Sequence, residues 1–115
     1  MSSYKQTRSF EERNEMSKRM MQKYPDRIPV IIEKAKDGDT ENLPKIKYLI
    51  PRDFTIAQFM TVLRKKIELS EKKSIFLYTD NGIPPSSESI SQLYNDQVDG
   101  DGFLYMKYAT ENTFG

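Results

Sequence analysis

Hydrophobic residues recur with the period of a helix in two segments of the chain. In the first, Met16, Met20 and Tyr24 are four residues apart and therefore share one helical face. Ser9 and Glu12 precede them with the spacing of a capping box, which favours a helix start at this point. The pattern predicts a helix that ends at the proline that follows Tyr24.

The second helical segment begins at another capping box, formed by Thr55 and Gln58. The apolar residues that suffice to pack its inner face are Ile56, Met60, Leu63 and Ile67. Phe59 and Val62 lie toward the edge of that face, where a groove could form. The segment is therefore predicted to be an amphipathic helix of about three turns.

Four runs rich in β-branched and aromatic residues predict strands. They are residues 28–33, 47–50, 74–79 and 103–108. Pro29 cannot donate to a strand ladder, which places it at a strand start or on an open side. Asn81 and Gly82 tolerate positive φ and predict a tight turn, and a short helix is predicted around Ile90.

The order of these elements is helix, strand, strand, helix, strand, short helix, strand. It predicts an α+β fold, a ubiquitin-like β-grasp with two additional N-terminal helices, the first of them a short turn near residues 4–8. We expect a helical extension over residues 1–25 and a core over residues 26–108. Residues 109–115 have no periodicity and are expected to form a flexible tail.

Composition excludes several kinds of chemistry. The 115 residues include no cysteine and no histidine, so a disulfide, a thiol nucleophile and the usual zinc ligands are all excluded. This composition fits a reducing compartment. Residues 1–79 hold 17 of the 18 basic and 11 of the 17 acidic side chains, so the body is basic and the remaining segment acidic. Such a division suits acidic partners or an anionic surface, although ordinary solvated faces give the same pattern.

Three alternative sites stay open on the sequence alone. Asp99 and Asp101 could form a carboxylate or metal site, or could belong to a glycine-rich turn. Residues 64–66 and 72–73 are basic and could bind nucleic acid, or could be a solvated helix end. The N-terminal helix could rest on an anionic membrane through Arg8, Arg13, Lys18, Arg19 and Lys23.

Several segments match one protein family in order and spacing. They include residues 10–13 (FEER), 24–35 (YPDRIPVIIEKA), 47–51 (KYLIP), 58–59 (QF), 64–67 (RKKI), 84–85 (PP), 101–105 (DGFLY) and 111–115 (ENTFG). Together they resemble the autophagy ubiquitin-like modifier family of the GABARAP type. The resemblance covers nearly the whole chain.

The resemblance implies a modifier, with no catalytic residue, metal or cofactor of its own. Such proteins are trimmed by a cysteine protease to expose a terminal glycine, here Gly115. Activating and conjugating enzymes then join that glycine to phosphatidylethanolamine. The chain would be cytoplasmic when free and on autophagosome or vesicle membranes when lipidated, with no nucleic-acid partner. The alternative is a ubiquitin-like adaptor that is never conjugated.

The resemblance also implies a groove for receptors that carry an aromatic-x-x-aliphatic motif. Residues 47–50 would be the edge strand to which such a peptide adds. The implied aromatic pocket comprises Met20, Pro29, Ile31, Lys47, Leu49 and Phe103. The implied aliphatic pocket comprises Tyr48, Ile50, Pro51, Phe54, Phe59 and Val62. Arg27, Lys47 and Lys66 would contact acidic residues that flank the motif. The competing interpretation is that these apolar side chains are simply core.

Some positions depart from the family. Met20 stands where isoleucine is common and Phe54 where leucine is common, so both pockets could be reshaped. Residues 75–78 match a third surface that some family partners use, although plain strand packing is the favoured interpretation.

Overall fold

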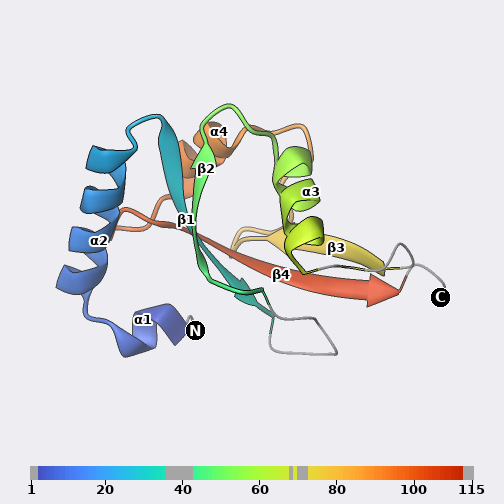
Figure 1. Cartoon of the computed structure of the whole chain (residues 1–115), viewed down its shortest axis with the longest axis horizontal. Coiled ribbons are helices and arrows are strands. Elements are labelled where there is room, and N and C mark those ends of the chain that lie inside the picture. Colours follow the sequence, from blue (N-terminus) through green and yellow to red (C-terminus); the bar gives the residue numbers. More distant parts are fainter. Residues whose placement is uncertain (1–2, 36–42, 68, 70–72, 113–115) are drawn as a thin grey trace.

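The computed structural model describes residues 3–35, 43–67, 69 and 73–112. In these residues, helices cover both faces of a mixed four-stranded sheet (Figure 1). The helices are α1 (Ser3–Thr7), α2 (Phe10–Lys23), α3 (Ile56–Lys66) and α4 (Ile90–Gln97). The strands are β1 (Arg27–Lys34), β2 (Lys47–Pro51), β3 (Lys73–Tyr78) and β4 (Leu104–Asn112).

The sheet has the order β2-β1-β4-β3. β1 and β2 form an antiparallel pair in which Val30 lies opposite Tyr48. β1 and β4 run parallel at the centre, with Val30 opposite Leu104, and β3 is antiparallel to β4. The predicted ubiquitin-like α+β fold with two N-terminal helices is therefore confirmed.

Alternation along β1 divides the apolar interior into two clusters. Ile28, Val30 and Ile32 point toward α3 and α4 and join the main core. Ile31 points to the opposite face and packs with Phe103 and residues of α1 and α2 in a second cluster. The N-terminal helices thus cover the face of the sheet that α3 leaves open.

Both predicted capping boxes are present. Ser9 Oγ accepts from Glu12 N at 3.2 Å, and the Glu12 carboxylate accepts from Ser9 N at 3.1 Å. Thr55 and Gln58 make the same reciprocal pair at the start of α3. Each box satisfies two N–H groups that a helix start leaves without intrahelical partners.

The predicted start of the tail at residue 109 is wrong. β4 continues to Asn112, and residues 109–112 pair with residues 73–76 of β3. The hydrophobic pattern of residues 109–112 is weak and did not predict a strand. These residues are stabilised by backbone hydrogen bonds to the neighbouring strand β3, which leave no such pattern in the sequence. Residues 113–115, including Gly115, lie outside the described residues.

Asp101 joins α2 to the start of β4 through several hydrogen bonds, which gives this carboxylate a structural role. Its buried carboxylate accepts from Arg13 Nη1 at 2.6 Å, Tyr105 Oη at 2.5 Å and Phe103 N at 2.9 Å. Its backbone oxygen accepts from Ser17 Oγ at 2.5 Å. No group of three or more carboxylates that could hold a metal occurs in the described part of the chain.

The proposed membrane-facing charges of the N-terminal helix are only partly available. Arg13 is committed to Asp101, and Arg19 pairs with Glu15 at 2.8 Å. In residues 3–35, 43–67, 69 and 73–112, no helix is long and apolar enough to cross a membrane.

Candidate functional site: a groove along strand β2

β2 lies at the edge of the sheet. Within the described residues it pairs with β1 alone, so its outer side carries backbone N–H and C=O groups without a strand partner. An extended peptide can pair with such an edge, and its alternate side chains then point into pockets on either side of the strand. The edge therefore supplies the backbone component of a peptide-binding site.

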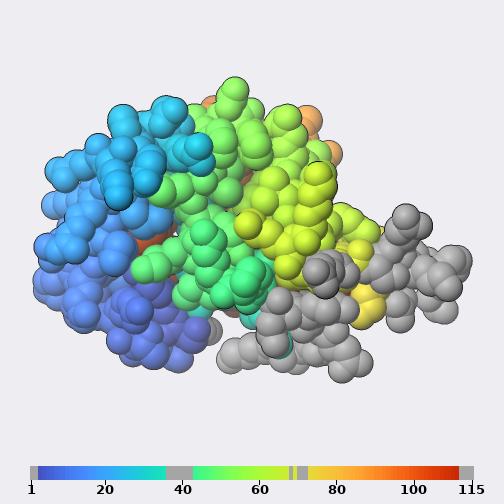
Figure 2. Space-filling model, viewed as in Figure 1, coloured from blue at the N-terminus to red at the C-terminus, as the bar shows by residue number. Residues whose placement is uncertain are grey.

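A groove of about 600 Å³ runs across β2 from α2 to α3. Figure 2 shows the corresponding hollow between α2 and the neighbourhood of β2. The lining residues are Met20, Tyr24, Arg27, Lys45, Lys47, Tyr48, Leu49, Ile50, Pro51, Phe54, Val62 and Lys66. This size falls in the usual range for ligand pockets.

At the α2 end of the groove, the structure brings together half of the residues expected for the aromatic pocket. Met20, Lys47 and Leu49 line the groove. Pro29 is buried and does not line it, and Ile31 and Phe103 are both 0% exposed. Ile31 and Phe103 lie in the second cluster, against which Met20 packs. They therefore support the wall of the groove from within.

At the α3 end, all but one of the residues expected for the aliphatic pocket line the groove. Tyr48, Ile50, Pro51, Phe54 and Val62 do so. Phe59 is 0% exposed and belongs to the main core. Its ring meets the Tyr48 ring edge to face, with 6.4 Å between centroids. Phe59 therefore lies in the core beneath Tyr48, and its predicted place at the edge of the helix face is wrong.

Cations gather around the groove. Arg27, Lys47 and Lys66 line it as the resemblance implied, and Lys45 joins them. Lys45 Nζ and Lys66 Nζ lie 5.0 and 6.0 Å from the centroid of the Tyr48 ring, so both positive charges lie close to this ring. This arrangement favours acidic groups on a bound peptide.

Tyr24 and Lys45 were missed by the sequence interpretation as groove residues. Tyr24 follows Met20 by four residues, so the helical period already placed both on one face. Lys45 precedes Lys47 by two residues, which is the spacing of side chains on one side of an extended segment. Both residues could therefore have been predicted from their spacing to Met20 and to Lys47.

Tyr48 has an unusual environment for a groove residue. Its hydroxyl oxygen is buried and has no hydrogen-bond partner among the described residues. Burial raises the pKa of Tyr48, so the hydroxyl is protonated at neutral pH. The side chain therefore acts as an aromatic floor for the groove and carries no negative charge.

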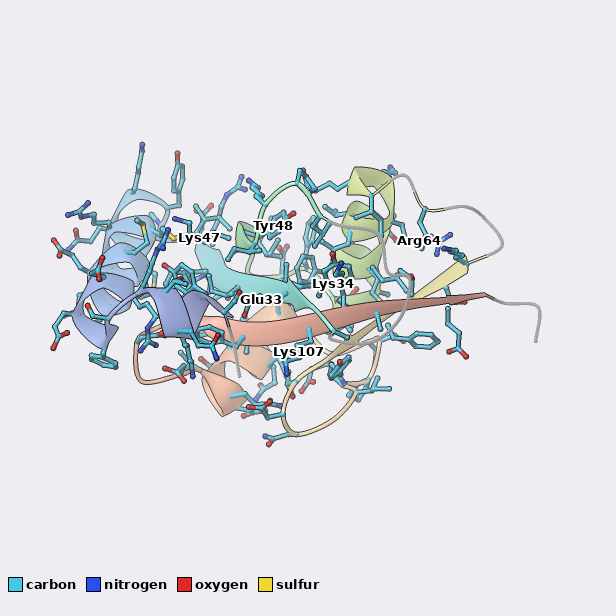
Figure 3. All side chains as sticks on the ribbon, turned by 90° about the horizontal axis from the view of Figure 1, so that it is seen from below. Glu33, Lys34, Lys47, Tyr48, Arg64 and Lys107 are labelled. Atoms are coloured by element: carbon cyan, nitrogen blue, oxygen red, sulfur yellow. The ribbon has the colours of Figure 1, made fainter. Side chains whose placement is uncertain are left out.

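The surface formed by residues 75–78 is a strand with one buried face. Ile75 and Leu77 belong to the main core, whereas Phe76 is 38% exposed and Tyr78 lines a separate cavity of about 340 Å³. That cavity is smaller than the groove and also contains Lys107, which Figure 3 shows on the side of the molecule away from Lys47 and Tyr48.

Comparison with protein families and curated proteins gives full-length similarity. The family described as "Autophagy protein Atg8 ubiquitin like" matches residues 12–115. Autophagy-related protein 8e of Arabidopsis thaliana is 50% identical over 112 residues, which cover 97% of this chain and 92% of that protein. Autophagy-related protein 8c of the same plant is 49% identical over 114 residues, which cover 99% of this chain and 96% of that protein.

Solved structures agree with this similarity. The crystal structure of Trypanosoma brucei ATG8 has a TM-score of 0.92 and 41% identity, and covers 100% of this chain and 99% of its own. Plasmodium falciparum Atg8, solved in complex with a Plasmodium falciparum Atg3 peptide, has a TM-score of 0.84 and 32% identity. That match covers 95% of this chain and 96% of the Plasmodium chain.

Proposed function

Because this chain belongs to the Atg8 family of ubiquitin-like autophagy proteins, we propose that it is a modifier with two linked activities. It is joined through Gly115 to phosphatidylethanolamine on autophagosomal membranes, and it recruits receptors and cargo through the groove along β2. The observation that carries the proposal is this groove, in which an apolar floor, an open strand edge and a cationic rim coincide. The rim consists of Arg27, Lys45, Lys47 and Lys66.

The receptor-binding activity follows from the shape and charge of the groove. Met20 and Leu49 line one end and Val62 and Phe54 the other, so two large apolar side chains of one extended peptide can be buried together. In an extended peptide, side chains at positions one and four of an aromatic-x-x-aliphatic motif are about 10 Å apart, because each residue advances the chain by roughly 3.3 Å. Acidic residues beside the motif meet the cations of the rim.

The conjugation activity rests on the family match and on the sequence. The match extends to Gly115, and glycine has no side chain to obstruct acyl transfer. The chain has neither cysteine nor histidine, so the thioester steps belong to an activating enzyme and a conjugating enzyme. A conjugating-enzyme partner is supported by the Plasmodium relative solved with an Atg3 peptide. A cysteine protease is the expected processing partner.

The proposed locations follow from the same chemistry. The free chain is cytoplasmic, and its lipid-joined form resides on autophagosome or vesicle membranes. The chain itself is the substrate of the conjugation reactions and performs no catalysis.

Reconstitution with activating enzyme, conjugating enzyme, ATP and phosphatidylethanolamine liposomes tests the conjugation. The expected result is a mass increase equal to one phosphatidylethanolamine less one water, and its loss in Gly115→Ala. Normal lipidation of Gly115→Ala would contradict the proposal. Failure of the wild-type chain to form a thioester with the activating enzyme would favour the unconjugated adaptor.

A further inference from the structure

Helix α1 is held in place by contacts with the sheet and with the loop before β4. It has five residues, too few to be stable as an isolated helix. The Glu33 carboxylate accepts from Ser3 Oγ at 2.8 Å and from Tyr4 N at 3.1 Å. Lys5 Nζ pairs with Asp99 Oδ1 at 2.5 Å. Figure 3 shows Glu33 beside α1, so β1 fixes the start of this helix directly.

These anchors place the Tyr4 ring inside the second cluster. Tyr4 is 3% exposed and packs with Ile31 and Phe103. The Tyr4 and Phe103 rings meet edge to face, with 5.7 Å between centroids and 83° between planes. Such pairs add stabilisation beyond the area that they bury. α1 therefore contributes one large aromatic side chain to the interior beneath α2.

This cluster reaches the groove through Met20. Met20 packs against the cluster on one side and lines the groove on the other. A methionine side chain is unbranched and adaptable, so the group on which it packs sets its position. If the Tyr4 ring were removed, the cavity left behind would let Phe103 and Met20 relax inward.

The hydroxyl of Tyr4 takes no part in this support. Its oxygen is buried and has no hydrogen-bond partner among the described residues. The supporting contribution therefore comes from the ring, and phenylalanine at this position can supply it. This separates the packing role of the ring from any polar role of the hydroxyl.

We propose that Tyr4 is a positioning residue for the α2 end of the groove, where it selects peptides with a large aromatic side chain. The inference rests on the proposed peptide-binding function and adds a determinant that lies outside the groove. Tyr4 acts through Phe103 and Ile31 on Met20, so its effect is greatest for the peptide side chain that contacts Met20. A peptide that does not fill this end is insensitive to it.

The test uses the full chain and two acidic-flanked peptides that differ only at the first motif position, tryptophan in one and alanine in the other. Dissociation constants are measured by calorimetry for wild type, Tyr4→Ala and Tyr4→Phe, at a temperature at which circular dichroism shows each variant fully folded. Phe10→Ala is the control, because Phe10 is an exposed aromatic residue of α2 outside the cluster.

We expect Tyr4→Ala to raise the dissociation constant of the tryptophan peptide about tenfold and that of the alanine peptide less than about twofold. The ratio of the two dissociation constants, which measures the preference for the aromatic side chain, therefore becomes smaller. Tyr4→Phe and Phe10→Ala retain the wild-type preference. An unchanged preference in Tyr4→Ala, with wild-type binding intact, would overturn the positioning role alone. If wild type bound neither peptide, the proposed peptide-binding function would fail and this inference with it.

Discussion

Arg13 Nη1 lies 2.6 Å from Asp101 Oδ2, and this ion pair joins helix α2 to the loop that leads into β4. The Asp101 side chain is completely buried, and the Arg13 side chain is nearly so. Tyr105 donates to the same carboxylate oxygen as Arg13. Helix α2, which borders the groove, is thus joined to the start of β4 by one buried carboxylate that accepts several hydrogen bonds.

Asp101→Asn should lower the free energy of unfolding by about 3–5 kcal/mol, because it leaves the buried Arg13 guanidinium without its counter-ion. Urea unfolding measures the change. Asp96→Asn is the matched control on the exposed side of α4 and should cost less than about 0.5 kcal/mol. Equal decreases in the free energy of unfolding of the two variants would show that the buried ion pair contributes no more to stability than an exposed carboxylate.

Phe59 and Val62 should respond differently to truncation, although they are three residues apart on α3. Phe59→Ala removes a fully buried ring and should cost about 3–5 kcal/mol in stability. Val62 lines the groove, so Val62→Ala should weaken motif-peptide binding several-fold at a stability cost of about 1 kcal/mol. Thermal unfolding and peptide titration separate the two effects. A Phe59→Ala variant as stable as wild type would contradict its place in the core.

The cations of the rim should make peptide binding sensitive to salt. Affinity for an acidic-flanked motif peptide should fall as ionic strength rises from 0.05 to 0.5 M, whereas a peptide with neutral flanks should bind almost equally at both, because salt screens exposed charges.

Lys66→Glu should lower the affinity for the acidic-flanked peptide about three- to tenfold, because it reverses one of the charges that line the groove. Lys18→Glu, an exposed α2 residue outside the groove, is the control. Equal sensitivity of the two peptides to Lys66→Glu would argue against charge recognition.

The contact between α1 and the loop before β4 should depend on pH through Asp99. Partial burial by itself raises the Asp99 pKa, but hydrogen bonds from Lys5 and from Asp101 N outweigh it and hold the pKa below its ordinary value of 3.8. A carboxyl whose pKa is lowered by folding stabilises the fold at higher pH, and this stabilisation is lost as the pH falls through the lowered pKa.

The stability difference between wild type and Asp99→Asn should therefore be constant near neutral pH and vanish as the pH falls below 3.8. Denaturant unfolding across this range measures it. A difference that persisted in strong acid would show that Asp99 acts by some means other than its charge.

Most of the fold followed from local patterns in the sequence. The capping boxes at Ser9 and Thr55 fixed two helix starts, because each satisfies backbone N–H groups locally. The end of β4 did not follow, because residues 109–112 are ordered by pairing with β3, which no local pattern reveals.

The groove was predictable only in part, for a related reason. Alternation along β1 assigns each residue to a face of the sheet, but both faces are covered by helices here. The family resemblance placed Ile31 and Phe103 in the groove, although Tyr4 of α1 packs with them in the second cluster. A short helix that is placed by tertiary contacts leaves little trace in hydrophobic periodicity.

Flotation of a motif peptide with liposomes tests the proposed function most directly, because it requires conjugation and groove binding at once. The chain is incubated with activating enzyme, conjugating enzyme, ATP and phosphatidylethanolamine liposomes, and a labelled tryptophan-motif peptide is added. We predict that the peptide floats with the liposomes for wild type and is left behind for Gly115→Ala and for Leu49→Ala, which alters the groove but not the terminus. Flotation of the peptide with Gly115→Ala at the wild-type level would contradict the central claim.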